Sequence, residues 1–126
     1  MKHLIIISFL ILGAFVFGQS KNEVIQQRIE FIAQDLEAEE VSLEDIFDVL
    51  NIYYDNPLNL NAATQEELQS LLLLNDFQIN ALLTWREEKG PFNTIFEIQE
   101  VEYWDLLTLE NILPFVRVSK VEEKKS

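Results

Sequence analysis

Apolar residues recur at helical spacing in two stretches ahead of Pro57. The members of the first stretch are Val24, Ile25, Ile29, Ile32 and Leu36. The members of the second stretch, which follows Ser42, are Leu43, Ile46, Phe47, Leu50 and Tyr53. Each series lies on one face of a helix, so the pattern predicts an amphipathic helical pair. Ser42 with Asp45 resembles a capping box, and the second helix must end before Pro57 because proline disfavours a helical conformation in the preceding residue.

After Pro57 the chain contains a new series of residues that cap helices or form turns. Asn59 and Asn61 are suited to local caps or turns, and Thr64 with Glu67 has the sequence of a capping box. The pattern predicts a short helix over about residues 65–72, a break near residues 74–76, and a longer helix over about residues 77–89.

A second unit of the same kind follows Gly90, which supplies a left-handed residue after a helix end. Thr94 is placed to begin a third helix, a break falls at residues 103–105, and a fourth helix spans about residues 106–113. The chain therefore repeats a short helix, a tight connection and a helix. A strand competes with this pattern only at residues 115–118.

Composition narrows the possible chemistry of this chain of 126 residues, which is long enough for one hydrophobic core. It has no cysteine, which excludes a disulfide framework, a thiolate metal site and a cysteine nucleophile. Three glycines are too few for a phosphate-cradling loop, and the one histidine, His3, lies next to the initiator methionine. We expect no cofactor and no metal site.

The first segment has the order of a secretory signal peptide. Lys2 and His3 precede an apolar run over residues 4–17, and small and polar residues follow. We expect cleavage between Gly18 and Gln19, with residues 1–18 as the signal peptide. The alternative is an uncleaved signal that anchors the chain to the inner membrane. In both cases the rest of the chain is exported, to the periplasm or the cell envelope.

Three segments together resemble the helix-hairpin-helix module of the bacterial competence DNA receptors, the ComEA-like family. They are Leu58-Asn-Leu-Asn-Ala-Ala-Thr-Gln-Glu-Glu-Leu68, Trp85-Arg-Glu-Glu-Lys-Gly-Pro-Phe92 and Leu113-Pro-Phe-Val116. The resemblance covers about Asn59 to Val116 without a gap. It implies an all-α fold with a tandem helix-hairpin-helix module over residues 57–118. The acidic helical pair, residues 19–56, precedes this module, and a polar tail, residues 119–126, follows it.

The resemblance also implies a mechanism and the residues that would carry it. In such modules each hairpin has a Gly-hydrophobic-Gly turn whose backbone N–H groups approach DNA phosphates, and such contacts carry no sequence information. Here the candidate contact tips are Leu73, Leu74 and Asn75 in the first turn and Tyr103, Trp104 and Asp105 in the second.

Both glycines are missing from both turns. Asn75 tolerates the left-handed region, whereas Leu73 puts a side chain where a phosphate would approach. Asp76 and Asp105 place carboxylates at helix starts, where we expect them to bond the N–H groups that DNA would use.

Charge disfavours DNA as a partner. The net charge of the chain is -13, and residues 57–118 carry three basic against ten acidic side chains. DNA binders gain most of their non-specific affinity from clustered lysine and arginine. Arg86 and Lys89 are the candidate phosphate contacts if DNA binds, but for Arg86 we favour pairing with Glu87, Glu88 or the helix end.

The apolar residues near the turns allow two interpretations. Tyr103, Trp104, Leu106 and Leu107 form either a partner-binding knob or part of the core. We favour the core for Leu107 and leave Trp104 open. The four leucines of residues 71–74 cannot all face one side of a helix, so at least one is exposed or covered, and the helical pair is the obvious cover.

Catalysis is not expected. The carboxylate pairs Glu66–Glu67 and Glu87–Glu88 are adjacent in sequence, and such neighbours point away from each other on a helix. The acidic run at residues 37–40 lacks a loop with calcium-binding spacing.

Two functions from different classes remain, and neither requires a small-molecule substrate. The first is an interaction or scaffold module in the cell envelope, whose partner is a protein there or a downstream domain of a longer product. The second is sequence-independent DNA binding through the hairpins.

Overall fold

A computed structural model describes residues 19–35 and 42–121 of the chain. The predicted signal peptide and the acidic run at residues 37–40 lie outside these ranges. Most of the described chain is helical, which confirms the all-α prediction. Within the same ranges, none of the helices combines the length and the hydropathy that crossing a bilayer requires.

The predicted helical pair is present as α2 (Lys21–Asp35) and α3 (Leu43–Asp55). The residues that α2 buries are Val24, Ile25 and Ile32, and those that α3 buries are Ile46 and Leu50. An ion pair of 2.8 Å joins Lys21 to Asp55. The capping box predicted at Ser42 is wrong, because its side chain makes no cap hydrogen bond although its backbone is extended.

The first hairpin consists of α4 (Gln65–Ser70) and α5 (Asp76–Lys89). The predicted capping box at its start is confirmed: the Glu67 N–H donates to Thr64 Oγ1 at 3.1 Å, and the Thr64 N–H donates to Glu67 Oε1 at 3.0 Å. The helix α4 ends two residues earlier than predicted, because Leu72 has a φ of 59° and cannot continue a right-handed helix.

The segment predicted as the second hairpin contains η1 (Ile95–Glu100) and α6 (Leu106–Ile112), which we call the second hairpin, and η2 (Leu113–Phe115) follows it. The third predicted helix is a 3₁₀ helix and not an α-helix. The Thr94 side chain makes no cap hydrogen bond, and Val101 is already extended at the other end.

Two short parallel strands join the ends of this part of the chain. Strand β1 (Leu58–Asn59) pairs with β2 (Val116–Arg117), with Leu58 opposite Val116 and Asn59 opposite Arg117. Only β2 was anticipated as a possible strand.

Next to the strands, two asparagines hold distant segments together. The Asn61 Nδ2 donates to the carbonyl oxygens of Phe92 at 2.9 Å and Ser119 at 3.0 Å, and its Oδ1 accepts from the Phe92 N–H at 2.7 Å. The Asn59 side chain donates to the Ser119 carbonyl and accepts from the Ser119 N–H, both at 3.1 Å. We call Asn59, Asn61, Phe92 and Ser119 the closure. The sequence suggested only local caps here and missed these long-range bonds.

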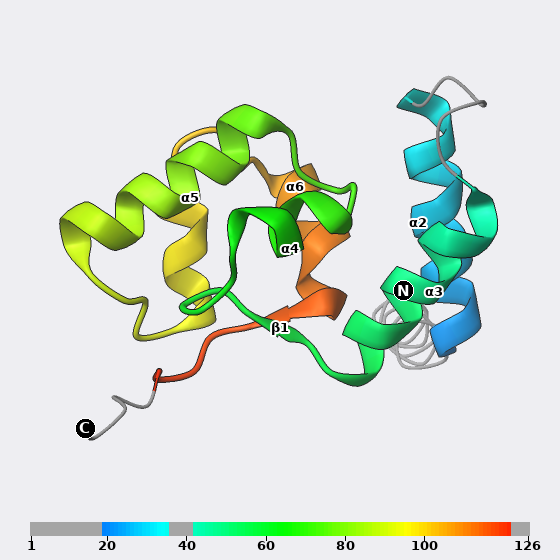
Figure 1. Cartoon of the computed structure of the whole chain (residues 1–126), viewed down its shortest axis with the longest axis horizontal. Coiled ribbons are helices and arrows are strands. Elements are labelled where there is room, and N and C mark those ends of the chain that lie inside the picture. Colours follow the sequence, from blue (N-terminus) through cyan, green and yellow to red (C-terminus); the bar gives the residue numbers. More distant parts are fainter. Residues whose placement is uncertain (1–18, 36–41, 122–126) are drawn as a thin grey trace, which may run out of the picture.

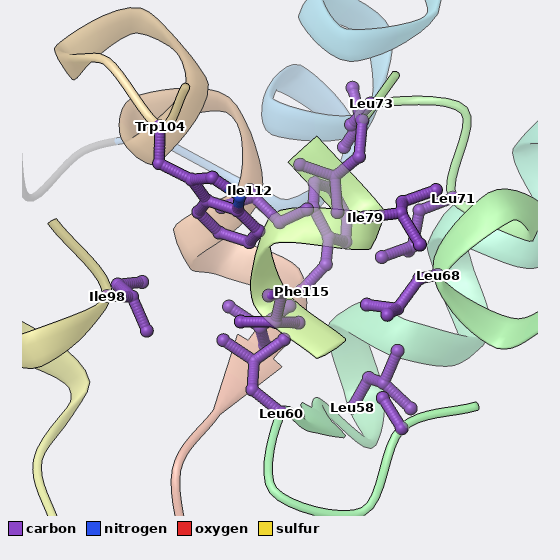
Figure 2. Close-up of a cluster of buried hydrophobic side chains, with 14 of the residues drawn as sticks. Leu58, Leu60, Leu68, Leu71, Leu73, Ile79, Ile98, Trp104, Ile112 and Phe115 are labelled. Atoms are coloured by element: carbon purple, nitrogen blue, oxygen red, sulfur yellow. The ribbon is translucent and has the colours of Figure 1, made fainter. Parts of the chain in front are cut away.

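The helical pair and the two hairpins share one core. Figure 1 shows α2 and α3 at one side and α5 at the other, with α4 and α6 between them. The cluster of buried residues contains Ile25 of α2, Leu50 of α3 and Leu68, Ile79 and Ile112 of the hairpins. Figure 2 shows the hairpin part of this cluster, which includes side chains from α4, α5 and α6.

Specific polar and aromatic contacts also dock the helical pair. The Arg28 Nε donates to the Asn111 carbonyl at 2.9 Å and its Nη2 donates to the Glu110 carbonyl at 3.0 Å, at the C-terminal end of α6 where carbonyls lack helical partners. Burial lowers the pKa of Arg28, and the Glu110 carboxylate opposes this shift. The Tyr54 ring meets the Phe115 ring edge-on at 6.2 Å.

Candidate functional site at the hairpin turns

The first turn is built differently from its prediction. The left-handed residue is Leu72, whereas Asn75 has a φ of -86° and is the N-cap of α5, so the left-handed role proposed for Asn75 is wrong. The Asn75 Oδ1 accepts from the Gln78 N–H and the Gln78 Oε1 accepts from the Asn75 N–H, each at 2.9 Å. An asparagine at this position prefers the cap because its side chain then satisfies an amide that the helix leaves unpaired.

The second turn places Tyr103, with a φ of 71°, three residues before Leu106, where α6 begins. The Asp105 Oδ1 accepts from the Thr108 N–H at 2.9 Å and from the Thr108 Oγ1 at 2.7 Å. These hydrogen bonds, the side-chain one first, lower the pKa of Asp105 because they stabilise its ionised form.

The prediction that carboxylates bond the helix-start amides is confirmed for Asp105 and wrong for Asp76. Asp76 is exposed in the first turn of α5, where the Asn75 amide oxygen is the capping group. The side chain that caps is the one immediately before the helix, and that residue is Asn75.

One side chain ties the two turns together. The Gln78 Nε2 donates to the Tyr103 carbonyl at 3.0 Å and to the Thr108 Oγ1 at 2.8 Å, while the Trp104 Nε1 donates to the Gln78 carbonyl at 3.0 Å. Among the described residues, no buried side-chain nitrogen or oxygen lacks a hydrogen-bond partner. A fully satisfied network of this kind fixes the relative position of the turns.

Three of the six candidate contact tips are buried. The exposed fractions of Leu73, Leu74 and Trp104 are 6%, 9% and 4%. Trp104, whose position the sequence left open, therefore belongs to the core. Figure 2 shows its ring among the buried side chains. The prediction that Leu73 projects toward an approaching phosphate is wrong. Leu73 and Leu74 line a small pocket together with Phe31 of α2, a side chain that packs against the same core cluster.

Four other apolar side chains face solvent at the turns, and we call them the tip surface. Their exposed fractions are 69% for Phe77, 58% for Tyr103, 70% for Leu106 and 54% for Leu107. The Phe77 and Tyr103 rings lie 5.9 Å apart. The core position predicted for Leu107 is wrong, because the residues of α6 that point inward are Thr108, Asn111 and Ile112.

Phe77 was missed by the sequence analysis. It stands outside the apolar stripe of α5, which contains Ile79 and Leu82 and faces the core. The sequence did contain a signal for its exposure. Phe77 is an aromatic residue at a helix start that lies outside the apolar positions with which α5 faces the core.

The charges around the tip surface are negative. Asp76, Glu102 and Asp105 are exposed beside it. The two candidate phosphate contacts lie elsewhere: the Arg86 Nη1 donates to the Ala63 carbonyl at 2.6 Å, and the Lys89 Nζ sits 4.0 Å from the centre of the Trp85 ring. The expected pairing of Arg86 with Glu87 or Glu88 is therefore wrong, since Arg86 holds α5 to the segment before α4.

Three other described cations also have partners away from the turns. Lys21 pairs with Asp55, Arg28 bonds the end of α6, and the Arg117 Nε donates to the Pro57 carbonyl at 3.0 Å. Within residues 19–35 and 42–121, no group of three or more histidine or acidic side chains is arranged to hold a metal ion.

Comparison with known proteins identifies no relative of this chain. No protein-family model, no curated protein and no solved structure matches the chain. The resemblance to the ComEA-like family stays a prediction from the sequence.

Proposed function

We propose that this chain is a non-catalytic protein-interaction module of the cell envelope and that the tip surface binds its partner. The observation that carries the proposal is the exposure of Phe77, Tyr103, Leu106 and Leu107 at the second turn and at the starts of α5 and α6, where the Phe77 and Tyr103 rings lie 5.9 Å apart. Soluble proteins bury most large apolar side chains, and a gathered set of exposed ones marks an interaction site. Tyrosine and other aromatic side chains are also the usual anchors of protein interfaces.

The tip surface suits binding because it is held in place before a partner arrives. Tyr103 and Leu106 flank the buried Trp104, and the Gln78 side chain links the second turn to the start of α5, where Phe77 lies. A preformed surface loses less conformational entropy on association than a flexible one.

The same geometry disfavours DNA. The amide of Gln78 already donates to Asn75, and the amide of Thr108 already donates to Asp105, so these helix-start donors are occupied. Exposed carboxylates surround the turns, and they repel phosphates. One contact at a helix start contributes about 1 kcal/mol at most, which does not offset a repulsive surface.

The location in the cell envelope rests on the first 18 residues, whose basic, apolar and small-residue order is that of a signal peptide. The tandem helix-hairpin-helix assignment, with its resemblance to the ComEA-like family, is part of the same proposal. It is supported by the order of two short elements, two tight turns and two following helices.

Site-specific photo-crosslinking in the cells that make this protein tests the proposal. A photoreactive phenylalanine at position 77 or 103 is expected to give crosslinks to a protein. The matched control is position 96, because Phe96 is an aromatic residue that is 74% exposed on η1 and does not belong to the tip surface. Equal crosslinking from positions 77 and 96 contradicts the proposal.

A second measurement compares the chain with a DNA receptor. Random-sequence duplex DNA at about 50 mM salt favours phosphate binders most, since their affinity falls steeply as salt rises. We expect no submillimolar affinity for the full chain. Submillimolar binding that weakens steeply with salt would replace the interaction module by the DNA-binding alternative.

A further inference from the structure

A groove follows the solvent-facing side of α5, starting at the tip surface. One side is formed by residues of α5 that recur at helical spacing, Phe77, Ala81, Thr84 and Glu88. The other side is formed by Glu100, Glu102 and Tyr103, from the end of η1 and the second turn. The volume of this α5 groove is about 370 Å³.

The dimensions of the α5 groove suit an extended chain. Phe77 and Glu88 are separated by eleven helical steps of 1.5 Å, which gives a length of roughly 16 Å. An extended peptide advances about 3.3 Å per residue, so about five residues span this length. The small side chains of Ala81 and Thr84 between the ends leave room for a backbone to approach α5.

The charge of the α5 groove selects the occupant. Glu88, Glu100 and Glu102 line it and are all exposed. Lys89 also lines the groove, and no ion pair within 4.0 Å joins it to these carboxylates in the part of the chain that the structure describes. Three carboxylates therefore face one ammonium group, and the lining keeps a negative balance. An acidic segment is therefore repelled from the groove and a basic one is attracted.

At one end of the groove the ammonium group of Lys89 lies over an aromatic ring. The Lys89 Nζ lies 4.0 Å from the centre of the Trp85 ring, and the Phe92 ring stacks on the same Trp85 ring at 5.7 Å with an interplanar angle of 7°. At the opposite end the Phe77 and Tyr103 rings lie 5.9 Å apart, and no cation of the described residues lies over them. A partner's basic side chain fits there, between this aromatic pair and Glu102.

We infer that the α5 groove binds an extended basic segment of a partner protein in which lysine or arginine alternates with apolar residues. This inference rests on the proposed function and specifies the chemistry of its partner. Alternate side chains of an extended segment point to opposite sides. The apolar ones pack at Ala81 on the α5 side of the groove, and the long basic ones lie over the Phe77 and Tyr103 rings and reach the carboxylates at the edges of the groove.

Fluorescence anisotropy with the full chain tests this inference at about 50 mM salt. The probe is a labelled heptapeptide of alternating lysine and leucine. One comparison peptide alternates glutamate with leucine, which keeps the apolar residues, and another alternates lysine with serine, which keeps the charge. We expect the lysine–leucine peptide to bind at least about tenfold more tightly than either, since both charge and apolar contact contribute.

Matched variants locate the binding. Glu88→Gln and Glu102→Gln are each expected to weaken the lysine–leucine peptide about threefold, as for the loss of one exposed ion pair. Glu87→Gln removes the same charge from the neighbouring exposed position of α5, which does not line the groove, and is expected to leave the affinity unchanged. Phe77→Ser is expected to weaken binding about tenfold. Circular dichroism confirms that each variant is folded.

Each contrary result has a distinct meaning. Equal affinity for the lysine–serine peptide, or equal weakening by Glu87→Gln and Glu88→Gln, overturns the groove as the binding site. If the lysine–leucine peptide does not bind while position 77 still crosslinks to a protein, the basic segment is wrong and the proposed function stands. If neither is observed, both are wrong.

Discussion

The two ends of the hairpin region use buried amide side chains for different purposes. At the closure, Asn61 bonds Phe92 and Ser119, residues 31 and 58 positions away, and so fastens the end of the chain to its middle. At the turns, Gln78 bonds Asn75 on its own hairpin and Tyr103 and Thr108 on the other. The closure presents no gathered set of large exposed apolar residues, whereas the turns present the tip surface.

This difference separates the part of the sequence that holds the fold from the part that meets a partner. The segments that resemble the ComEA-like family include Asn59, Asn61, Arg86 and Phe92, and all of them make internal hydrogen bonds. The residues in the place of the family's turn glycines are instead bulky, acidic or capping.

The largest effect is expected at the closure. Asn61→Ala removes three hydrogen bonds and leaves the buried backbone groups of Phe92 without partners, so we expect the free energy of unfolding to fall by about 3 kcal/mol. Urea denaturation followed by circular dichroism measures it. Asn80→Ala, an exposed position within α5, is the control and is expected to change stability by less than about 0.5 kcal/mol. Similar losses for the two variants would show that the closure does not hold the fold.

A smaller loss is expected at the turns. Gln78→Met keeps the length of the side chain but cannot bond Asn75, Tyr103 or Thr108, so unfolding should become about 2 kcal/mol easier. The control Gln69→Met, at an exposed position of α4, is expected to lie within about 0.5 kcal/mol of the unaltered chain. If Gln78→Met lowers the free energy of unfolding more than Asn61→Ala does, the closure does not contribute more to stability than the turns.

The smallest effect is a pH dependence at the second turn. The pKa of Asp105 is lowered in the folded chain by its bonds to Thr108, so its ionised form stabilises the fold above the unfolded pKa of about 3.9. This contribution is lost as the pH falls through the lower, folded pKa. The unaltered chain should therefore be more stable than Asp105→Asn at pH 6, and the difference should shrink below about pH 4. Thermal unfolding at several pH values measures this, and a difference that stays constant to pH 2 contradicts it.

Local sequence signals predicted the helices well because the forces that decide them are local. The capping box of Thr64 and Glu67 and the stop before Pro57 were both correct, since they depend on contacts within one turn of the chain. The 3₁₀ form of η1 was missed, as was the left-handed Leu72 in place of Asn75. In the first turn the preference of asparagine for the left-handed region competed with its value as a cap, and the cap prevailed.

The candidate site was predicted less well than the fold. The turns were located to within a residue or two, but which of their side chains are exposed was not. Leu73 and Trp104 are buried although they lie in turns, and Phe77, Leu106 and Leu107 are exposed although they are helical and apolar.

The sequence by itself determined the helical periodicity, the capping box of Thr64 and Glu67 and the negative charge, because each depends on the identity of residues that are close along the chain. Only the tertiary structure decided the rest. The docking of Arg28 on α6, the pocket that Leu73 lines with Phe31 and the bond from Gln78 to the second turn join residues far apart in sequence. Exposure depends on which elements pack together, so the tip surface and the α5 groove exist only once the two hairpins and the helical pair have met.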